Sequence, residues 1–381
     1  MSNTLPSTRS LVAQALHYID EASGGVVPPI QPSTTFGRDE NYELLGEYSY
    51  GRYGSPTVAK VEEVLARLDE GADALAFSSG LAAFAALFET VRTGQHMVAP
   101  EIMYHGGQDW LRMIAERRGI GLTLFDQTKP GALEEAIRPG ETAIVWIETP
   151  VNPTWDVIDI AAAANAAHAA GARLGVDATV ATPVSTRPLE HGADIVFHSA
   201  TKYLNGHSDV NAGVLVCGEA NPFWEEIFVN RKYLGSILGT FEAWLLLRGM
   251  RTLFVRFEAS SRNALKIAKH FKDHTKLESV LYPGLESHPG HNVAARQMTG
   301  GFGGMMSVLV KGGEADAKKV AAALKLFVPA TSLGGVESLA EHRKTVEGPH
   351  SLVAPNLIRL SIGIEEADDL IADLEQALAT L

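Results

Sequence analysis

One lysine, Lys202, follows an apolar run, residues 193–197, that is typical of a buried strand. Two hydroxyl residues, Ser199 and Thr201, lie between that run and the lysine. Open α/β sheets bind their ligands at the carboxyl ends of the strands. Lys202 is therefore a candidate Schiff-base residue, and the two hydroxyls are candidate phosphate ligands. The alternative for Lys202 is an exposed loop lysine, which is the commonest environment of this residue type.

Three other apolar runs also end in polar residues. One leads to Asp177, another to a segment that contains Asn152, and a third to the turn Ser79-Gly80-Leu81. An alanine-rich segment of strong helix propensity follows the turn, and the free N–H groups at the start of such a helix can bind phosphate. A Schiff-base lysine, an acid for a pyridinium nitrogen, an asparagine and a phosphate turn are what pyridoxal 5′-phosphate (PLP) requires of its protein. For Asp177, the alternative is an acid that caps the next helix.

The elements that must position these residues follow from the alternation of short apolar runs with longer helical segments. Between residues 50 and 250 this pattern predicts a doubly wound, mainly parallel sheet, the cofactor-binding domain. Residues 1–49 are rich in proline and glycine and predict an extended N-terminal arm. Residues 251–381 predict a smaller C-terminal α/β domain that ends in an amphipathic helix.

Composition excludes several classes of function. A chain of 381 residues with 46% hydrophobic residues can build two cores. The net charge of −13 argues against a nucleic-acid or anionic-membrane partner. The single cysteine, Cys217, excludes an internal disulfide and favours the cytoplasm. No apolar run is long enough to span a membrane, the first residues lack a secretory signal, and the histidine spacing predicts no metal site.

Seven segments in order along the chain resemble the Cys/Met-metabolism family of PLP-dependent enzymes, which includes cystathionine γ-synthase, cystathionine γ-lyase, cystathionine β-lyase and methionine γ-lyase. These segments are residues 50–57, 79–83, 148–153, 176–179, 199–203, 332–339 and 358–365. The resemblance implies the aspartate aminotransferase-like fold of PLP enzymes (fold type I), with a C-terminal domain that closes over the substrate. It also implies a homotetramer, built as a dimer of dimers.

The resemblance assigns roles around the cofactor ring and the substrate. Lys202 would hold PLP and then move protons between Cα, C4′ and Cβ. Asp177 would pair with the protonated pyridine nitrogen, and Asn152 would donate a hydrogen bond to the phenolic oxygen of the cofactor. Arg359 would grip the α-carboxylate of an amino-acid substrate through its two-pronged guanidinium group. Ser332 matches a serine near the substrate and Lys202.

The resemblance also implies how the phosphate and the ring face are bound. The phosphate ligands within one subunit would be Ser79, Gly80, Leu81, Ser199 and Thr201. Tyr50 and Arg52 match a pair that completes the phosphate site of a neighbouring subunit, whereas an exposed arm residue is the alternative for Arg52. Tyr104 resembles the catalytic tyrosine that stacks on the pyridine ring, although His105 interrupts the usual motif after it.

Departures from the family pattern bear on the substrate. Leu81 replaces a methionine, Ala178 replaces an asparagine, and residues 342–348 stand in place of the family's usual His-Pro-Ala-x-Met-Thr-His segment. Glu347 falls where the family has a small hydroxyl residue, so it is a candidate to bind a cationic side chain such as that of canavanine. The alternative is a solvated loop acid that balances Arg343 and Lys344.

We therefore predict PLP-dependent γ-elimination on a γ-substituted L-amino acid of homoserine type, as in cystathionine γ-lyase. The alternative is γ-replacement, as in cystathionine γ-synthase or an O-acylhomoserine sulfhydrylase, because both reactions share their early steps. Two further alternatives are a β-lyase and a non-catalytic PLP-binding protein with a structural or regulatory role. The intact Lys202, Asp177 and Arg359 argue against a non-catalytic role, since a binding protein needs neither a proton carrier nor a carboxylate site.

Overall fold

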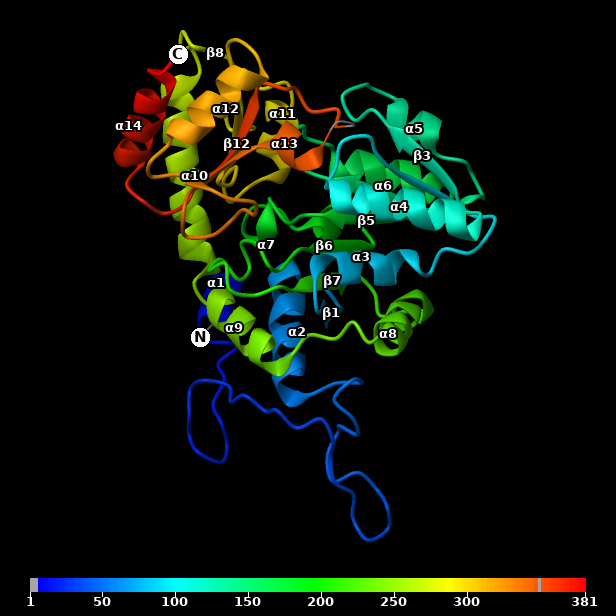
Figure 1. The fold of residues 1–381 in the computed structure, drawn as a ribbon. Coiled ribbons are helices and arrows are strands. Elements are labelled where there is room, and N and C mark those ends of the chain that lie inside the picture. The colour runs from blue at the N-terminus through cyan, green and yellow to red at the C-terminus, as the bar shows by residue number, and fades with distance from the viewer. Residues whose placement is uncertain (1–5, 349–350) are drawn as a thin grey trace, which may run out of the picture.

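The computed structural model describes residues 6–348 and 351–381, which form a seven-stranded and a five-stranded sheet (Figure 1). The order of the larger sheet is β1-β7-β6-β5-β4-β2-β3, and that of the smaller is β10-β11-β12-β9-β8. The strands of the larger sheet are β1 (Asp73–Phe77), β2 (His96–Pro100), β3 (Gly121–Phe125), β4 (Thr142–Glu148), β5 (Arg173–Asp177), β6 (Ile195–His198) and β7 (Gly213–Cys217). The strands of the smaller sheet are β8 (Leu277–Leu281), β9 (Met305–Val310), β10 (Val328–Pro329), β11 (Leu339–His342) and β12 (Leu357–Ser361).

The larger sheet is mainly parallel, as the sequence predicts. Strands β2, β3, β4, β5 and β6 pair in parallel, whereas β7 is antiparallel to both of its neighbours, β1 and β6. The carboxyl ends of β1, β2, β4, β5 and β6 therefore meet at one edge of the sheet, which is where ligands of open α/β sheets bind. The predicted fold class is confirmed.

Helices cover both faces of the larger sheet because successive apolar side chains of a strand point to opposite faces. On β4, Ile144 and Trp146 pack with α3 and α4, and Val145 and Ile147 pack with α5 and α6. Helices α2 and α9 lie on the same side as α6, and α8 lies with α3. These helices are α2 (Pro56–Asp69), α3 (Gly80–Phe88), α4 (His105–Arg118), α5 (Ala132–Ala136), α6 (Ile160–Ala169), α8 (Pro222–Leu234) and α9 (Thr240–Met250).

Three helices pack on the smaller sheet, and one of them, α10, also reaches the larger core. Phe257 of α10 belongs to the core around α2 and α9, and Ile267 belongs to the core of the smaller sheet. The three helices are α10 (Leu253–Phe271), α12 (Glu314–Ala323) and α14 (Ala367–Leu378). Shorter helices lie in the connections: α7 (Thr182–Ser185), η1 (Pro188–His191), α11 (His291–Gln297) and α13 (Arg343–Glu347). No helix of the described ranges has the length and apolarity to cross a membrane.

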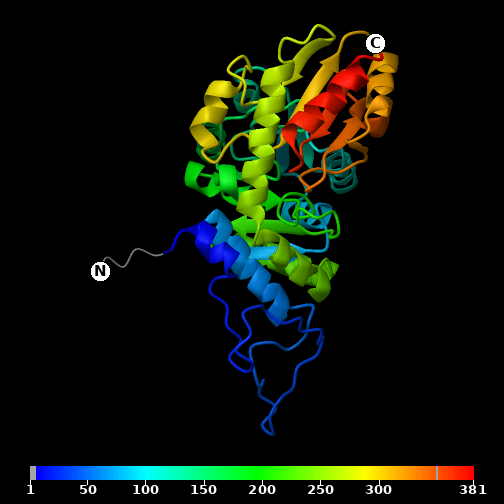
Figure 2. The same cartoon turned by 90° about the vertical axis from the view of Figure 1, so that its left-hand side faces the viewer.

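The N-terminal segment leaves the body of the molecule as a long loop (Figure 2). A short helix, α1 (Thr8–Ala13), first packs against the body through the buried Val12. The proline and glycine content did not indicate this helix. Beyond it, the arm exposes large apolar side chains, among them Val26, Tyr42 and Leu45.

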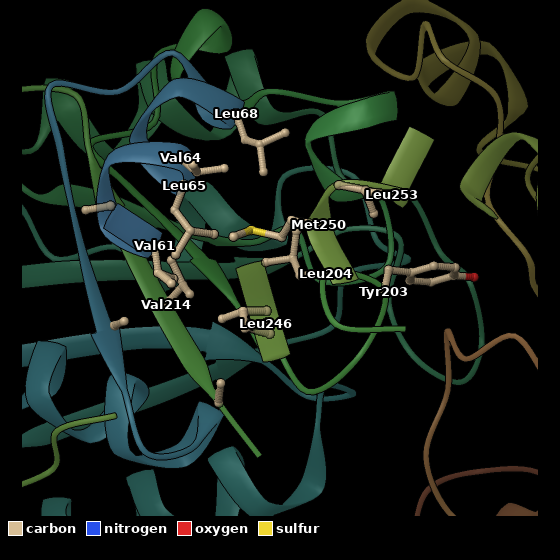
Figure 3. Close-up of a cluster of buried hydrophobic side chains, with 14 of the residues drawn as sticks. Val61, Val64, Leu65, Leu68, Tyr203, Leu204, Val214, Leu246, Met250 and Leu253 are labelled. Carbon is tan, nitrogen blue, oxygen red and sulfur yellow. The ribbon is translucent and has the colours of Figure 1, made fainter. Parts of the chain in front are cut away.

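A dense core supports the segment that carries Lys202. Leu204 lies among side chains of α2 and α9, including Leu65 and Met250 (Figure 3). All three of these side chains are at most 1% exposed. Because interiors pack at crystal-like density, this contact holds the backbone after Lys202 in one position.

Candidate active site

A cavity of about 220 Å³ lies at the carboxyl ends of the parallel strands. Its walls come from residues that follow β1, β2, β4, β5 and β6, the arrangement that the sequence predicts for a ligand site. The predicted site residues that line it are Ser79, Gly80, Leu81, Tyr104, Asn152, Asp177, Ser199, Thr201 and Lys202. Nine residues from five separate segments of the chain are thus brought together.

Lys202 is poised as a nucleophile in this cavity. Its Nζ donates a hydrogen bond to Ser332 Oγ at 2.9 Å. Burial lowers the pKa of Lys202 to about 8, and the positive charge of Arg359 adds to that effect. A larger fraction of this amine is therefore unprotonated near neutral pH than for an exposed lysine, which a group that attacks an aldehyde requires.

A buried arginine fixes the backbone that follows the lysine. Arg256 of α10 donates hydrogen bonds to the carbonyl oxygens of Tyr203 and Leu204 at 2.8 and 3.3 Å. The Tyr203 hydroxyl accepts a hydrogen bond from Gly304 N at 3.0 Å, which ties the segment to the residue just before β9 of the smaller sheet. A Cβ on Gly206, whose φ is +72°, would lie only 1.9 Å from Arg256 Nη1, so this turn requires glycine.

Two buried acids, Asp177 and Glu148, lie side by side at the ends of β5 and β4. Burial raises the pKa of both carboxyls, and the charge of Asp177 raises that of Glu148 further. Thr179 opposes the shift by donating its backbone N–H to Asp177 Oδ1 at 2.9 Å. Within residues 6–348 and 351–381, Asp177 forms no ion pair with lysine, arginine or histidine. A cation that enters the cavity beside Asp177 would be stabilised.

Glu148 positions two other predicted site residues. Its Oε2 accepts a hydrogen bond from Tyr104 N, and its Oε1 accepts one from Asn152 N, both at 2.8 Å. Tyr104 thereby places its ring in the cavity wall despite the unusual His105 that follows it. A Cβ on Gly106 would lie 2.9 Å from that ring, so glycine at this position leaves room for the tyrosine.

The amino-terminal end of α3 forms the polar end of the cavity. Ser79 is the N-cap of α3 and accepts a hydrogen bond from Ala82 N at 3.1 Å. A Cβ on Gly80 would lie 3.0 Å from Ser199 Oγ, so the missing side chain lets the turn and this hydroxyl approach each other. Thr201 also lines this end, although its hydroxyl is hydrogen-bonded to the backbone of Ala212.

Arg359 of β12 contacts both Ser332 and Asn152. Its Nη2 donates to the Ser332 carbonyl at 2.8 Å, and its Nη1 donates to Asn152 Oδ1 at 3.2 Å. Ser332 has a φ of +131°, a strained conformation for a residue with a side chain, and such strain is frequent at functional sites. One residue thus contacts both Lys202 through its hydroxyl and Arg359 through its carbonyl.

The structure places Glu347 on α13, outside the residues that line the cavity. Its Oε1 accepts hydrogen bonds from Arg343 Nη2 at 2.6 Å and Nε at 3.1 Å, and its Oε2 accepts one from Ser351 Oγ at 2.6 Å. The carboxylate is only 10% exposed. Glu347 is therefore neither a solvated loop acid nor a carboxylate that is free to bind a substrate.

Tyr50 and Arg52 lie on the arm and do not line the cavity of their own chain. Arg52 donates a hydrogen bond to the Lys232 carbonyl at 3.1 Å, and its guanidinium lies 5.4 Å from the centre of the Tyr50 ring. Tyr50 is 43% exposed. The pair is therefore presented at the surface, near the end of α8.

The residues of the cavity fit PLP. The unpaired buried Asp177 suits a protonated pyridine nitrogen, and Lys202 suits the aldehyde carbon. The N–H groups at the start of α3, with the hydroxyl of Ser199, suit a phosphate.

Sequence reasoning missed several residues that organise the site. Glu148 and Thr179 stand within the recognised segments, but only the structure shows that each positions a neighbour. Arg256 carries no local signal, since its partners lie about fifty residues away. Glu341, which is buried, directly precedes the divergent segment, and a charged residue beside the apolar Leu339 and Ala340 was the available signal.

Comparisons with known proteins agree with this geometry. The model of the Cys/Met metabolism PLP-dependent enzyme family matches residues 9–379. Cystathionine gamma-synthase of Mycobacterium tuberculosis is 42% identical over 379 residues, covering 98% of this chain and 96% of that protein. Cystathionine gamma-lyase of Sus scrofa is 40% identical over 387 residues, covering 98% and 95%. The structure of cystathionine gamma synthase from Xanthomonas oryzae pv. oryzae in complex with cystathionine is 36% identical, with a TM-score of 0.94 over 99% of this chain and 98% of that one.

Proposed function

The chain belongs to the Cys/Met metabolism family of PLP-dependent enzymes, and on this premise we propose that it catalyses γ-elimination on a γ-substituted L-amino acid of homoserine type. The family's named relatives are lyases and synthases, so the chain is an enzyme and PLP is its cofactor. The observation that carries the proposal is the double contact of Ser332, with Lys202 on one side and Arg359 on the other. An amine site and a carboxylate site that flank the same serine suit an α-amino acid.

In the proposed mechanism, Arg359 holds the substrate carboxylate and Lys202 removes the proton from Cα and then one from Cβ. PLP supplies an electron sink for the charge that proton removal leaves on the substrate. Asp177 would keep the pyridine nitrogen protonated, and Asn152 would donate a hydrogen bond to the phenolic oxygen. Tyr104 would stack on the ring, and its hydroxyl would protonate the leaving group at Cγ. The Ser79 turn, Ser199 and Thr201 would hold the phosphate.

γ-Replacement is the second candidate because the M. tuberculosis relative named above is a γ-synthase. The two reactions diverge when water or a thiol meets the shared intermediate, so the products separate them. We would incubate the purified enzyme with cystathionine, O-acylhomoserines plus cysteine, methionine and canavanine. Release of 2-oxobutanoate and cysteine from cystathionine supports γ-elimination, whereas pyruvate and homocysteine would indicate β-elimination. A new thioether from the O-acylhomoserine supports γ-replacement, and no turnover of any of them contradicts both proposals.

We further propose that Tyr50 and Arg52 complete the phosphate site of a neighbouring subunit, in a tetramer built from dimers. The exposed apolar side chains of the arm support this assembly, because such a surface is usually covered by a partner. The buried free thiol of Cys217 is consistent with the cytoplasm as the proposed location.

Mixed oligomers test the shared site. Arg52→Ala and Lys202→Ala should each give little activity, and co-expression should restore about a quarter of the parental activity, since random pairing gives one intact site in each mixed dimer. Tagged subunits and tandem purification verify the mixing. An active monomer, or no recovery in verified mixed dimers, would contradict the proposal.

The contacts of Glu347 favour a structural role over selection of a cationic substrate. We expect Glu347→Gln to change kcat/KM for canavanine and for cystathionine by the same factor, because Arg343 and Ser351 already occupy the carboxylate. Steady-state kinetics on both substrates measure the two factors. A loss of about tenfold or more confined to canavanine would instead support the guanidinium-binding hypothesis.

A further inference from the structure

A buried cluster of four charged side chains surrounds the proposed carboxylate site. Arg343 and Glu347 come from α13, Glu341 from β11, and Arg359 from β12, which pairs with β11 (Figure 1). The two arginine side chains are 2% and 4% exposed, and Glu341 is 5% exposed. Two positive and two negative charges thus balance one another away from water.

Glu341 stands between the two arginines. Its Oε2 lies 2.7 Å from Arg359 Nη2 and 2.6 Å from Arg343 Nη1. Hydrogen bonds to this carboxylate come from Arg343 on Oε2 and from the Thr331 hydroxyl, at 2.6 Å, on Oε1. Arg343 and Thr331 therefore hold the acid, while Arg359 is only in charge contact with it.

This arrangement poses a problem for a substrate carboxylate. An amino acid bound to Arg359 would bring a second negative charge close to Glu341, and like charges in a site of low dielectric repel strongly. Without another cation, Glu341 would pair with Arg359 alone and compete with the substrate.

We propose that Arg343 is the positioning residue that resolves this competition: it neutralises and retains Glu341, so that Arg359 is available to the α-carboxylate of the substrate. The inference rests on the proposed function, because it assumes that Arg359 binds that carboxylate. Arg343 also retains Glu347 by its remaining N–H groups, which keeps its own side chain fixed. The divergent segment thus supplies a charge to the carboxylate site rather than a contact to the distal part of the substrate.

The test measures how strongly the holoenzyme prefers a carboxylate. Aminooxyacetate and O-methylhydroxylamine react with the same bound cofactor and bleach its visible band, but only the first carries a carboxylate, so the ratio of their rate constants reports the carboxylate site without turnover. Arg343→Met should lower this ratio by about tenfold to a hundredfold. The KM of the best substrate should rise by a similar factor, while kcat stays within about threefold of the parent.

Rescue separates this role from general stability. Adding Glu341→Gln to Arg343→Met removes the competing charge and should return the ratio towards that of the parent. Arg231→Met, which removes another buried arginine paired with Glu62, should lower the melting temperature without changing the ratio. If Arg343→Met does not fold, Arg343→Gln keeps a donor for Glu341 without the charge and should lower the ratio in the same way.

Two results would overturn the inference: an unchanged ratio in the folded Arg343 variant, or a lowered ratio that Glu341→Gln does not restore. Arg359→Met distinguishes this failure from failure of the proposed function. If Arg359→Met leaves the carboxylate preference intact, the proposed carboxylate site itself is wrong. If it abolishes the preference while the Arg343 variant keeps it, only the role of Arg343 is wrong.

Discussion

Replacing Lys202 by alanine should lower kcat/KM at least about a thousandfold, because one amine both holds the cofactor and carries the protons. The cavity should survive the substitution, because Arg256 and the core hold the surrounding backbone. The lysine side chain itself donates a hydrogen bond to Ser332. Steady-state kinetics measure the loss. The exposed Lys129 is the control, and Lys129→Ala should retain parental activity.

The pH dependence of cofactor attachment gives the same residue a second test. Only the unprotonated amine attacks the aldehyde, and the pKa of Lys202 is lowered from 10.5 to about 8. In cofactor-free protein, the rate of PLP attachment should therefore rise with pH up to about 8 and then level off. A rate that still rises steeply between about pH 9 and 10 would indicate an ordinary lysine.

Replacing Arg359 by methionine should lower kcat/KM by about thirtyfold to several hundredfold, mainly through KM. A buried guanidinium that pairs with a carboxylate through two charge-assisted hydrogen bonds contributes about 2–4 kcal/mol, and about 1.4 kcal/mol corresponds to a factor of ten. The variant should fold, because Glu341 keeps Arg343 and Thr331 as partners.

The exposed Arg296, whose pair with Asp159 lies on the surface, provides the matched control. Arg296→Met should leave both kinetic constants unchanged. If Arg359→Met lowers kcat alone and leaves KM unchanged, Arg359 acts at a later step than carboxylate binding.

The sequence predicted the larger sheet and most of the cavity because the signals there are local. Each buried strand is a short apolar run, and each run delivers its polar residue at the carboxyl end, as at Asp177 and Lys202. Parallel strands then bring those ends together without further information. The helix after Gly80 was predictable for the same reason, from its alanine-rich composition.

The parts that sequence reasoning missed depend on contacts between distant segments. Arg256 and Gly206 fit each other across about fifty residues, and neither is unusual within its own segment. The burial of Glu347 was not predicted, for a related reason. The charged residues of the segment suggested exposure. In the structure, Arg343 and Glu347 occupy positions i and i+4 of helix α13 and form a buried ion pair.

Lys202 is the residue on which the proposed chemistry depends most, and covalent mapping tests most directly whether it holds PLP. The purified protein is reduced with borohydride, digested and analysed by mass spectrometry. We predict a yellow protein that loses its visible band and carries a single phosphopyridoxyl group on the peptide that contains Lys202. A colourless protein that takes up no added cofactor, or a label on a different lysine, would contradict the account.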